Sequence, residues 1–120
     1  MTKPIRKVAV YGAGVIASGM AAQAANAGCE VVMLGYGPDE AGDNLERMKK
    51  ATPFKDKMWM QLMHPDLAKQ IKTGDMTNDE DMKLIADADL VIEAVPEKPD
   101  VKRAAHERIN AYASEEAVLG

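Results

Sequence analysis

The sequence contains a single cysteine, has no long hydrophobic run and carries no excess of positive charge. One cysteine, Cys29, excludes an internal disulfide and suits the reducing cytoplasm. No apolar run approaches the roughly 18 residues of a membrane span. Gly12 and Gly14 interrupt the apolar segment that a signal peptide would need. The net charge of −4 argues against a nucleic acid or an anionic membrane as partner.

Length and composition are those of one globular domain. A chain of 120 residues can bury one core and is too short for two domains. Hydrophobic residues make up 47% of the chain and charged residues 28%, which is ordinary for a globular protein. We therefore expect residues 1–120 to form a single domain.

A glycine turn near the N-terminus is the most informative segment. Residues 8–19 read V-A-V-Y-G-A-G-V-I-A-S-G, a short apolar run followed by two glycines and a helical stretch. Gly12 permits a tight turn, Gly14 lets phosphates approach the main chain, and Ala17 is the small residue where helix and strand pack. This arrangement is typical of a dinucleotide-binding turn. The alternative is a glycine-rich turn without a ligand.

The predicted cofactor contacts at this turn come mainly from the backbone. Free N–H groups at the start of the helix, together with the helix dipole, favour an anion. We expect a pyrophosphate to lie against Gly12, Ala13, Gly14, Val15 and Ile16.

Strand and helix patterns alternate along the chain. Strands are expected over residues 7–11, 30–34, 70–73, 90–95 and 117–119. Helices are expected over residues 15–27, 38–50, 78–86 and 98–113, with Thr77 or Asn78 as the cap of the third and Pro38 at the first position of the second. Ile16, Met20 and Ala24 are expected to form the packing stripe of the first helix. Within residues 51–68, the segment 55–64 is expected to form a short helix whose Met and Trp side chains make local core rather than a ligand site.

This order predicts an α/β fold, a Rossmann-type doubly wound parallel sheet that is truncated at the start of its fifth strand. Right-handed crossovers make the strand at 7–11 central, with the strand at 90–95 beside it. The loops after these two strands, 12–17 and 96–98, should therefore face one crevice. A ligand is expected at such a topological switch point.

Two segments resemble the NAD-binding domain of the L-3-hydroxyacyl-CoA dehydrogenases, including 3-hydroxybutyryl-CoA dehydrogenases. They are G-A-G-V-I-A-S-G-M-A-A-Q-A-A-N-A-G at 12–28 and V-I-E-A-V-P-E-K-P-D-V-K-R at 91–103. The resemblance implies NAD as cofactor, Glu97 near its nicotinamide end and Lys102 in contact with it. Val95 is expected at the same crevice.

Two glutamates near the second segment have alternative interpretations. Glu97 could be a solvated residue at a helix start, where a carboxylate favours the dipole. Glu93 lies inside an apolar strand, which is costly unless it is paired or at the open end of the strand. A structural role for Glu93 is the first interpretation and a direct cofactor role the second.

The catalytic part of the family has no counterpart in this chain. In the family, the strand that begins near Val118 leads to a catalytic histidine with its glutamate partner, and then to a helical domain that completes the acyl-CoA pocket. His64 and His106 do not match that histidine and are expected to be surface or packing residues. With Cys29 and Asp66 they have no metal-ligand spacing, so no metal is expected. The resemblance thus implies a domain that binds NAD and catalyses nothing by itself.

Gly35 departs from the family pattern. Family members usually end the second strand with an aspartate whose carboxylate accepts both adenosine-ribose hydroxyls. Here no carboxylate follows before Asp39, and no arginine is present for a 2′-phosphate. Since hydrogen bonds to a charged group are worth about 1.5–3 kcal/mol, dinucleotide binding is expected to be about 10- to 100-fold weaker. Tyr36 either stacks on adenine, which would recover part of this loss, or is an exposed turn residue.

Two functions from different classes follow. The first is the NAD-binding domain of an oxidoreductase that moves hydride between NAD and a 3-hydroxyacyl-CoA, with acyl-CoA bound only by the full-length enzyme. The second is an engineered or excised scaffold with altered cofactor binding, which self-associates through an open strand edge. A homo-oligomer formed through that edge is the expected assembly in the second case.

Overall fold

The computed structural model describes residues 5–12, 15–49, 71–95 and 98–119. The predicted helix within 51–68 and the site residues Ala13, Gly14 and Glu97 lie outside the described residues. His64 and most of the loop at 96–98 lie outside them too.

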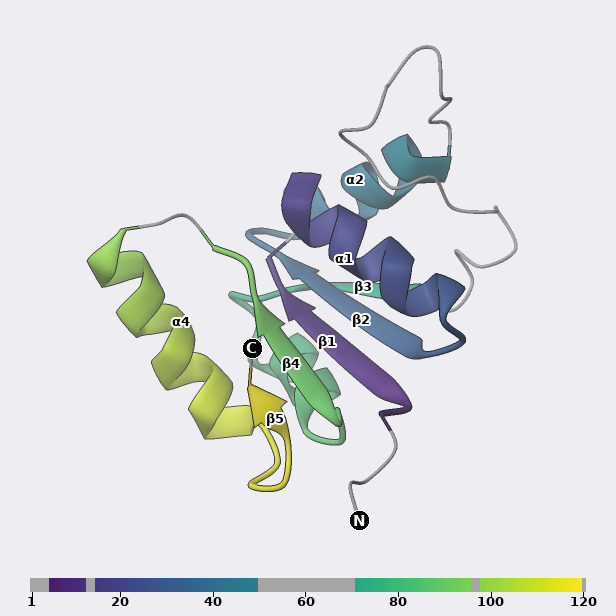
Figure 1. Cartoon of the computed structure of the whole chain (residues 1–120). Coiled ribbons are helices and arrows are strands. Elements are labelled where there is room, and N and C mark those ends of the chain that lie inside the picture. The colour runs from purple at the N-terminus through teal and green to yellow at the C-terminus, as the bar shows by residue number, and fades with distance from the viewer. Residues whose placement is uncertain (1–4, 13–14, 50–70, 96–97, 120) are drawn as a thin grey trace.

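Five parallel strands form one sheet in the order β3-β2-β1-β4-β5 (Figure 1). They are β1 (Lys7–Tyr11), β2 (Glu30–Gly35), β3 (Ile71–Asp75), β4 (Leu90–Glu93) and β5 (Val118–Leu119). β1 is central and β4 lies beside it, as the crossover rule predicts. The predicted doubly wound parallel sheet is confirmed.

The helices occupy the predicted places with small shifts at their ends. They are α1 (Val15–Asn26), α2 (Glu40–Lys49), α3 (Asp79–Met82) with the 3-10 turn η2 (Lys83–Ile85), and α4 (Pro99–Tyr112). Asn78 is the cap of α3, because its side chain accepts hydrogen bonds from the backbone N–H groups of Glu80 and Asp81. Pro38 does not begin α2, so that prediction is wrong. Pro38 lies exposed in the preceding turn, two residues before the helix starts.

Helices cover both faces of the sheet, and the central strands β1 and β2 alternate their side chains between two cores. Buried residues of α1 and α2 pack on one face, against strand residues that include Val8, Val10, Val31 and Met33. Buried residues of α3, η2 and α4 pack on the other face, against strand residues that include Ala9, Tyr11, Val32 and Leu34. Burial on both faces explains why β1 and β2 read as almost continuous apolar runs.

The packing stripe of α1 lies one residue beyond the predicted one. Ala17, Ala21 and Ala25 are almost completely buried, whereas Met20 and Ala24 are only half-buried. An alanine-rich helix without a charged face carries little information about which side faces the core. The alanines let α1 approach the sheet closely, as predicted for Ala17.

The turn after β1 requires glycine at position 12. Gly12 has a φ of +135°, and its N–H donates to the Leu34 carbonyl at 2.8 Å. A Cβ atom at this position would lie 2.5 Å from the carbonyl oxygen of Ala94. The chain therefore leaves β1 in main-chain contact with the segment after β4, which only glycine permits.

We expect Gly12→Ala to lower the free energy of unfolding by at least about 2 kcal/mol, because the variant adds a backbone clash to an unfavourable φ. Gly42→Ala is the matched control, since its Cβ would meet nothing within 4 Å in α2 and alanine favours helix. Urea denaturation measures both variants. Equal stability of the two would contradict the close approach at Gly12.

Candidate functional site

The carboxyl ends of β1, β2 and β4 lie level at one edge of the sheet. Tyr11 is in register with Leu34 on one side and with Glu93 on the other. This register places Gly12, Gly35 and Ala94 side by side, at the points where β1, β2 and β4 end. The predicted switch point between β1 and β4 is present in the fold.

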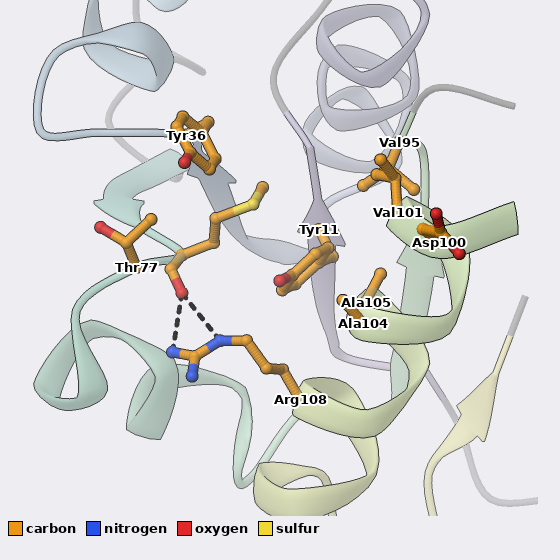
Figure 2. A pocket seen from close by; sticks show the side chains of 10 residues that line it. Tyr11, Tyr36, Thr77, Val95, Asp100, Val101, Ala104, Ala105 and Arg108 are labelled. Carbon is orange, nitrogen blue, oxygen red and sulfur yellow. Dashed lines mark hydrogen bonds between the residues drawn. The ribbon is translucent and has the colours of Figure 1, made fainter. Parts of the chain in front are cut away.

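A cavity of about 490 Å3 opens at this edge, between the sheet and α4 (Figure 2). Its walls come from the end of β1, the turns after β2 and β3, the segment after β4 and the first turns of α4. Most lining groups are apolar, among them Met76, Val95, Val101 and Ala104. A mainly apolar cleft of this volume with a few polar groups is typical of a small-molecule site.

Two predicted site residues, Tyr36 and Val95, line this cavity from opposite sides (Figure 2). The side chain of Tyr36 is 74% exposed, so its ring lies at the rim rather than in the core. The exposed ring of Tyr36 thus borders the cavity, and its stacking on adenine stays a prediction.

Arg108 of α4 holds one wall of the cavity in place. Its guanidinium donates from Nε and Nη2 to the Met76 carbonyl at 3.1 and 2.8 Å, and from Nη2 to Asp79 at 3.3 Å. Burial raises the pKa of the neighbouring Tyr11, and the charge of Arg108 opposes this rise only in part. The Tyr11 phenol therefore stays neutral at physiological pH and offers a neutral polar group at the wall.

Sequence reasoning missed Tyr11, Met76, Thr77 and Arg108 as cavity residues. The switch point indicated which loops face the site, but it carried no information about which face of α4 turns toward it. The one available signal was Tyr11, a polar aromatic residue at the end of an otherwise apolar strand.

Gly35 is the last residue of β2 and is buried. Its carbonyl accepts a hydrogen bond from the Met76 N–H at 2.8 Å. The position predicted to contact the ribose is thus level with Gly12 and next to the cavity, and it offers only backbone.

Glu93 has the structural role that was the first interpretation of its position. Its side chain is 9% exposed and accepts from Lys102 Nζ at 3.0 Å and from the Val95 N–H at 3.2 Å. His106 Nε2 lies 3.5 Å from the same carboxylate. Burial raises the pKa of Glu93. The hydrogen bonds from Lys102 and Val95 and the nearby positive charge lower this pKa by more, so it lies below its usual value.

The remaining predicted site residues have simpler outcomes. Val15 and Ile16 begin the backbone of α1, as predicted for the helix start behind the glycine turn. Lys102 lies on α4 and is held against Glu93, with its side chain 33% exposed. Its predicted cofactor contact stays a prediction.

Within the described ranges, no group of three His, Cys, Asp or Glu side chains could hold a metal ion. The described helices include none long and apolar enough to cross a membrane.

We expect acid to destabilise the wild-type chain more than Glu93→Gln. The folded pKa of Glu93 lies below the usual 4.5, so its charged form stabilises the fold above that pH, and this stabilisation is lost as the pH falls through the folded pKa. Urea midpoints between pH 7 and pH 3 measure the effect. Glu107→Gln, exposed on the same helix, is the control and should keep the wild-type acid sensitivity. An unchanged acid slope in Glu93→Gln would show that the pair adds no pH-dependent stability.

Sequence comparisons identify the relatives of this fold and site. The family model described as 3-hydroxyacyl-CoA dehydrogenase, NAD binding domain matches residues 7–120. A putative fatty acid oxidation complex trifunctional enzyme of Rickettsia felis is 35% identical over 99% of this chain and 16% of its own length. A probable 3-hydroxyacyl-CoA dehydrogenase of Deinococcus radiodurans is 35% identical over 96% of this chain and 33% of its own length. The chain thus spans a third or less of these two relatives.

Solved structures agree with the sequence comparisons. A diketoreductase that acts on dicarbonyl compounds superposes with a TM-score of 0.79 at 26% identity, over 98% of this chain and 41% of its own. The (S)-3-hydroxybutyryl-CoA dehydrogenase of Ralstonia eutropha superposes with a TM-score of 0.68 at 25% identity, over 97% of this chain and 40% of its own. With the glycine turn, the switch point and the second signature on one sheet edge, the chain belongs to the 3-hydroxyacyl-CoA dehydrogenase family, of which it matches the NAD-binding domain.

Proposed function

We propose that this chain binds NAD along the carboxyl edge of the sheet and that the larger protein moves hydride between NAD and a 3-hydroxyacyl-CoA. The pyrophosphate lies over the turn at Gly12 and the start of α1, where N–H groups and the helix dipole favour an anion. The observation that carries the proposal is the main-chain approach at Gly12, where only glycine fits against the Ala94 carbonyl, as in a dinucleotide-binding turn.

The apolar cavity takes the adenine in this proposal. It adjoins Gly35 through Tyr36 and Met76, so an adenosine that follows the pyrophosphate outward from Gly12 reaches it. The exposed ring of Tyr36 is available to stack on the base. In this proposal the chain binds the cofactor, and hydride transfer takes place in the larger protein, where a general base lies beside the acyl-CoA.

Three further expectations belong to the same proposal. Lys102 and Glu97 act at the cofactor, as the resemblance implies. The protein works in the cytoplasm, which a single cysteine and an acidic balance favour. A homo-oligomer formed through an open strand edge is the third expectation.

Titration with NADH, followed by the fluorescence of the nicotinamide, tests the proposal. Saturable binding in the micromolar range is the expected result, and no binding at millimolar NADH contradicts it. Ala104→Phe fills the cavity from α4 and should weaken binding at least tenfold. Ala111→Phe, exposed further along α4, is the control and should bind as the wild type does. Equal NADH affinities of the two variants would show that the adenine does not bind in this cavity.

Gly35→Asp is expected to tighten NADH binding by about tenfold, because hydrogen bonds from ribose hydroxyls to a carboxylate are worth about 1.5–3 kcal/mol. The same titration measures it. An unchanged affinity would mean that position 35 does not face the ribose.

A further inference from the structure

The structure brings a carboxylate to the turn where Gly35 lacks one. Asp75 is the last residue of β3 and is in register with Gly35, the last residue of β2. Both strands end at the edge that carries Gly12. The Asp75 backbone therefore lies one strand further out than the position where the family usually has its aspartate.

The Asp75 side chain reaches back over the turn after β2. Its Oδ1 accepts from the Gly37 N–H at 3.0 Å, from the Thr77 N–H at 2.9 Å and from Thr77 Oγ1 at 2.7 Å. Gly37 adopts a φ of +96° in this turn, a conformation that glycine adopts at little cost. The carboxylate is thus tied to the same turn that carries Tyr36 to the rim of the cavity.

One oxygen of this carboxylate remains available to a ligand. All three hydrogen bonds to the side chain fall on Oδ1, and Oδ2 accepts none from the part of the chain that the structure describes. The Thr77 hydroxyl and the backbone N–H groups hold the pKa of Asp75 below its usual value, so the group is anionic at neutral pH. An anionic oxygen accepts hydrogen bonds from hydroxyls and repels a phosphate.

The charges around Asp75 are mixed. Asp81 lies beneath it, since Asp81 Oδ2 accepts from the Asp75 N–H at 2.8 Å, and Asp79 follows on α3. Arg108 is the cation that acts on Asp75, and its guanidinium is held by the Met76 carbonyl and by Asp79. The described side chains at this turn therefore favour a neutral ribose over a phosphorylated one.

We propose that Asp75 sets the cofactor preference of this site, selecting a dinucleotide with free adenosine-ribose hydroxyls against one with a 2′-phosphate. This inference rests on the proposed function. Asp75 at the end of β3 provides the negative charge that is missing at Gly35, at the end of β2. The alternative is that Asp75 only ties the turn together, in which case it affects both dinucleotides alike.

The affinities of Asp75→Asn for NADH and NADPH distinguish a role in cofactor preference from a role in holding the turn alone. The amide oxygen of asparagine can still accept from Gly37 and Thr77, so the turn is kept while the charge is removed. We expect the NADPH affinity to rise about tenfold relative to that for NADH. Asp87→Asn is the control, because Asp87 pairs with Lys7 at the opposite end of the sheet, and it should leave the ratio unchanged. An unchanged ratio in Asp75→Asn, or an equal fall of both affinities, overturns the inference.

Two further measurements keep the test decisive. In Gly35→Asp combined with Asp75→Asn, the preference for NADH should return, because a carboxylate is back at the turn. In the wild type, raising the salt concentration should improve NADPH binding relative to NADH binding, because salt screens repulsion. The opposite salt effect overturns the inference even if Asp75→Asn does not fold. A wild type that binds neither NADH nor NADPH overturns the proposed function instead.

Discussion

The main-chain contact between Gly12 and Ala94 is the constraint on which the rest of this edge depends. It brings the exit of β1 against the exit of β4, while the Gly12 N–H keeps a hydrogen bond to the Leu34 carbonyl of β2. Three strand ends are thus held level without a side chain between them. The α1 helix then starts directly behind the turn, and its buried alanines let it lie close to the sheet.

Electrostatics at this edge are divided between two carboxylates with different tasks. Glu93 is almost completely buried and accepts a hydrogen bond from Lys102, which ties the end of β4 to α4. Asp75 lies at the outer side and ties the turn after β2 through Gly37. The cavity between them is mainly apolar, with the Arg108 guanidinium bound to the Met76 carbonyl. A mainly apolar cleft with a few polar groups is typical of a small-molecule site.

Local patterns were sufficient to predict the elements of the fold, and insufficient to predict how their faces meet. The alternation of apolar strands and helices placed every described strand and helix to within a few residues, and the structure selected Asn78 over Thr77 as the cap of α3. The stripe of α1 was assigned one residue too early, because a helix of alanines has no polar face to mark its outside. The fixed φ of Pro38 suits the first position of a helix, which is why the sequence predicts a helix start there. In the structure Pro38 lies instead in the turn that contains Gly37.

The sequence by itself predicted the family, from two motifs that are each local, and the order of strands, from the alternation of strand and helix together with the right-handed crossover rule. Only the tertiary structure decided what stands beside Gly35. Asp75 is 38 residues from Gly37 along the chain, and its carboxylate reaches that turn because β2 and β3 pair in one register. Pairing register and the facing side of α4 arise from packing over the whole sheet, which no local pattern contains. The charge missing from one strand end was therefore visible in the sequence, and the charge beside it was not.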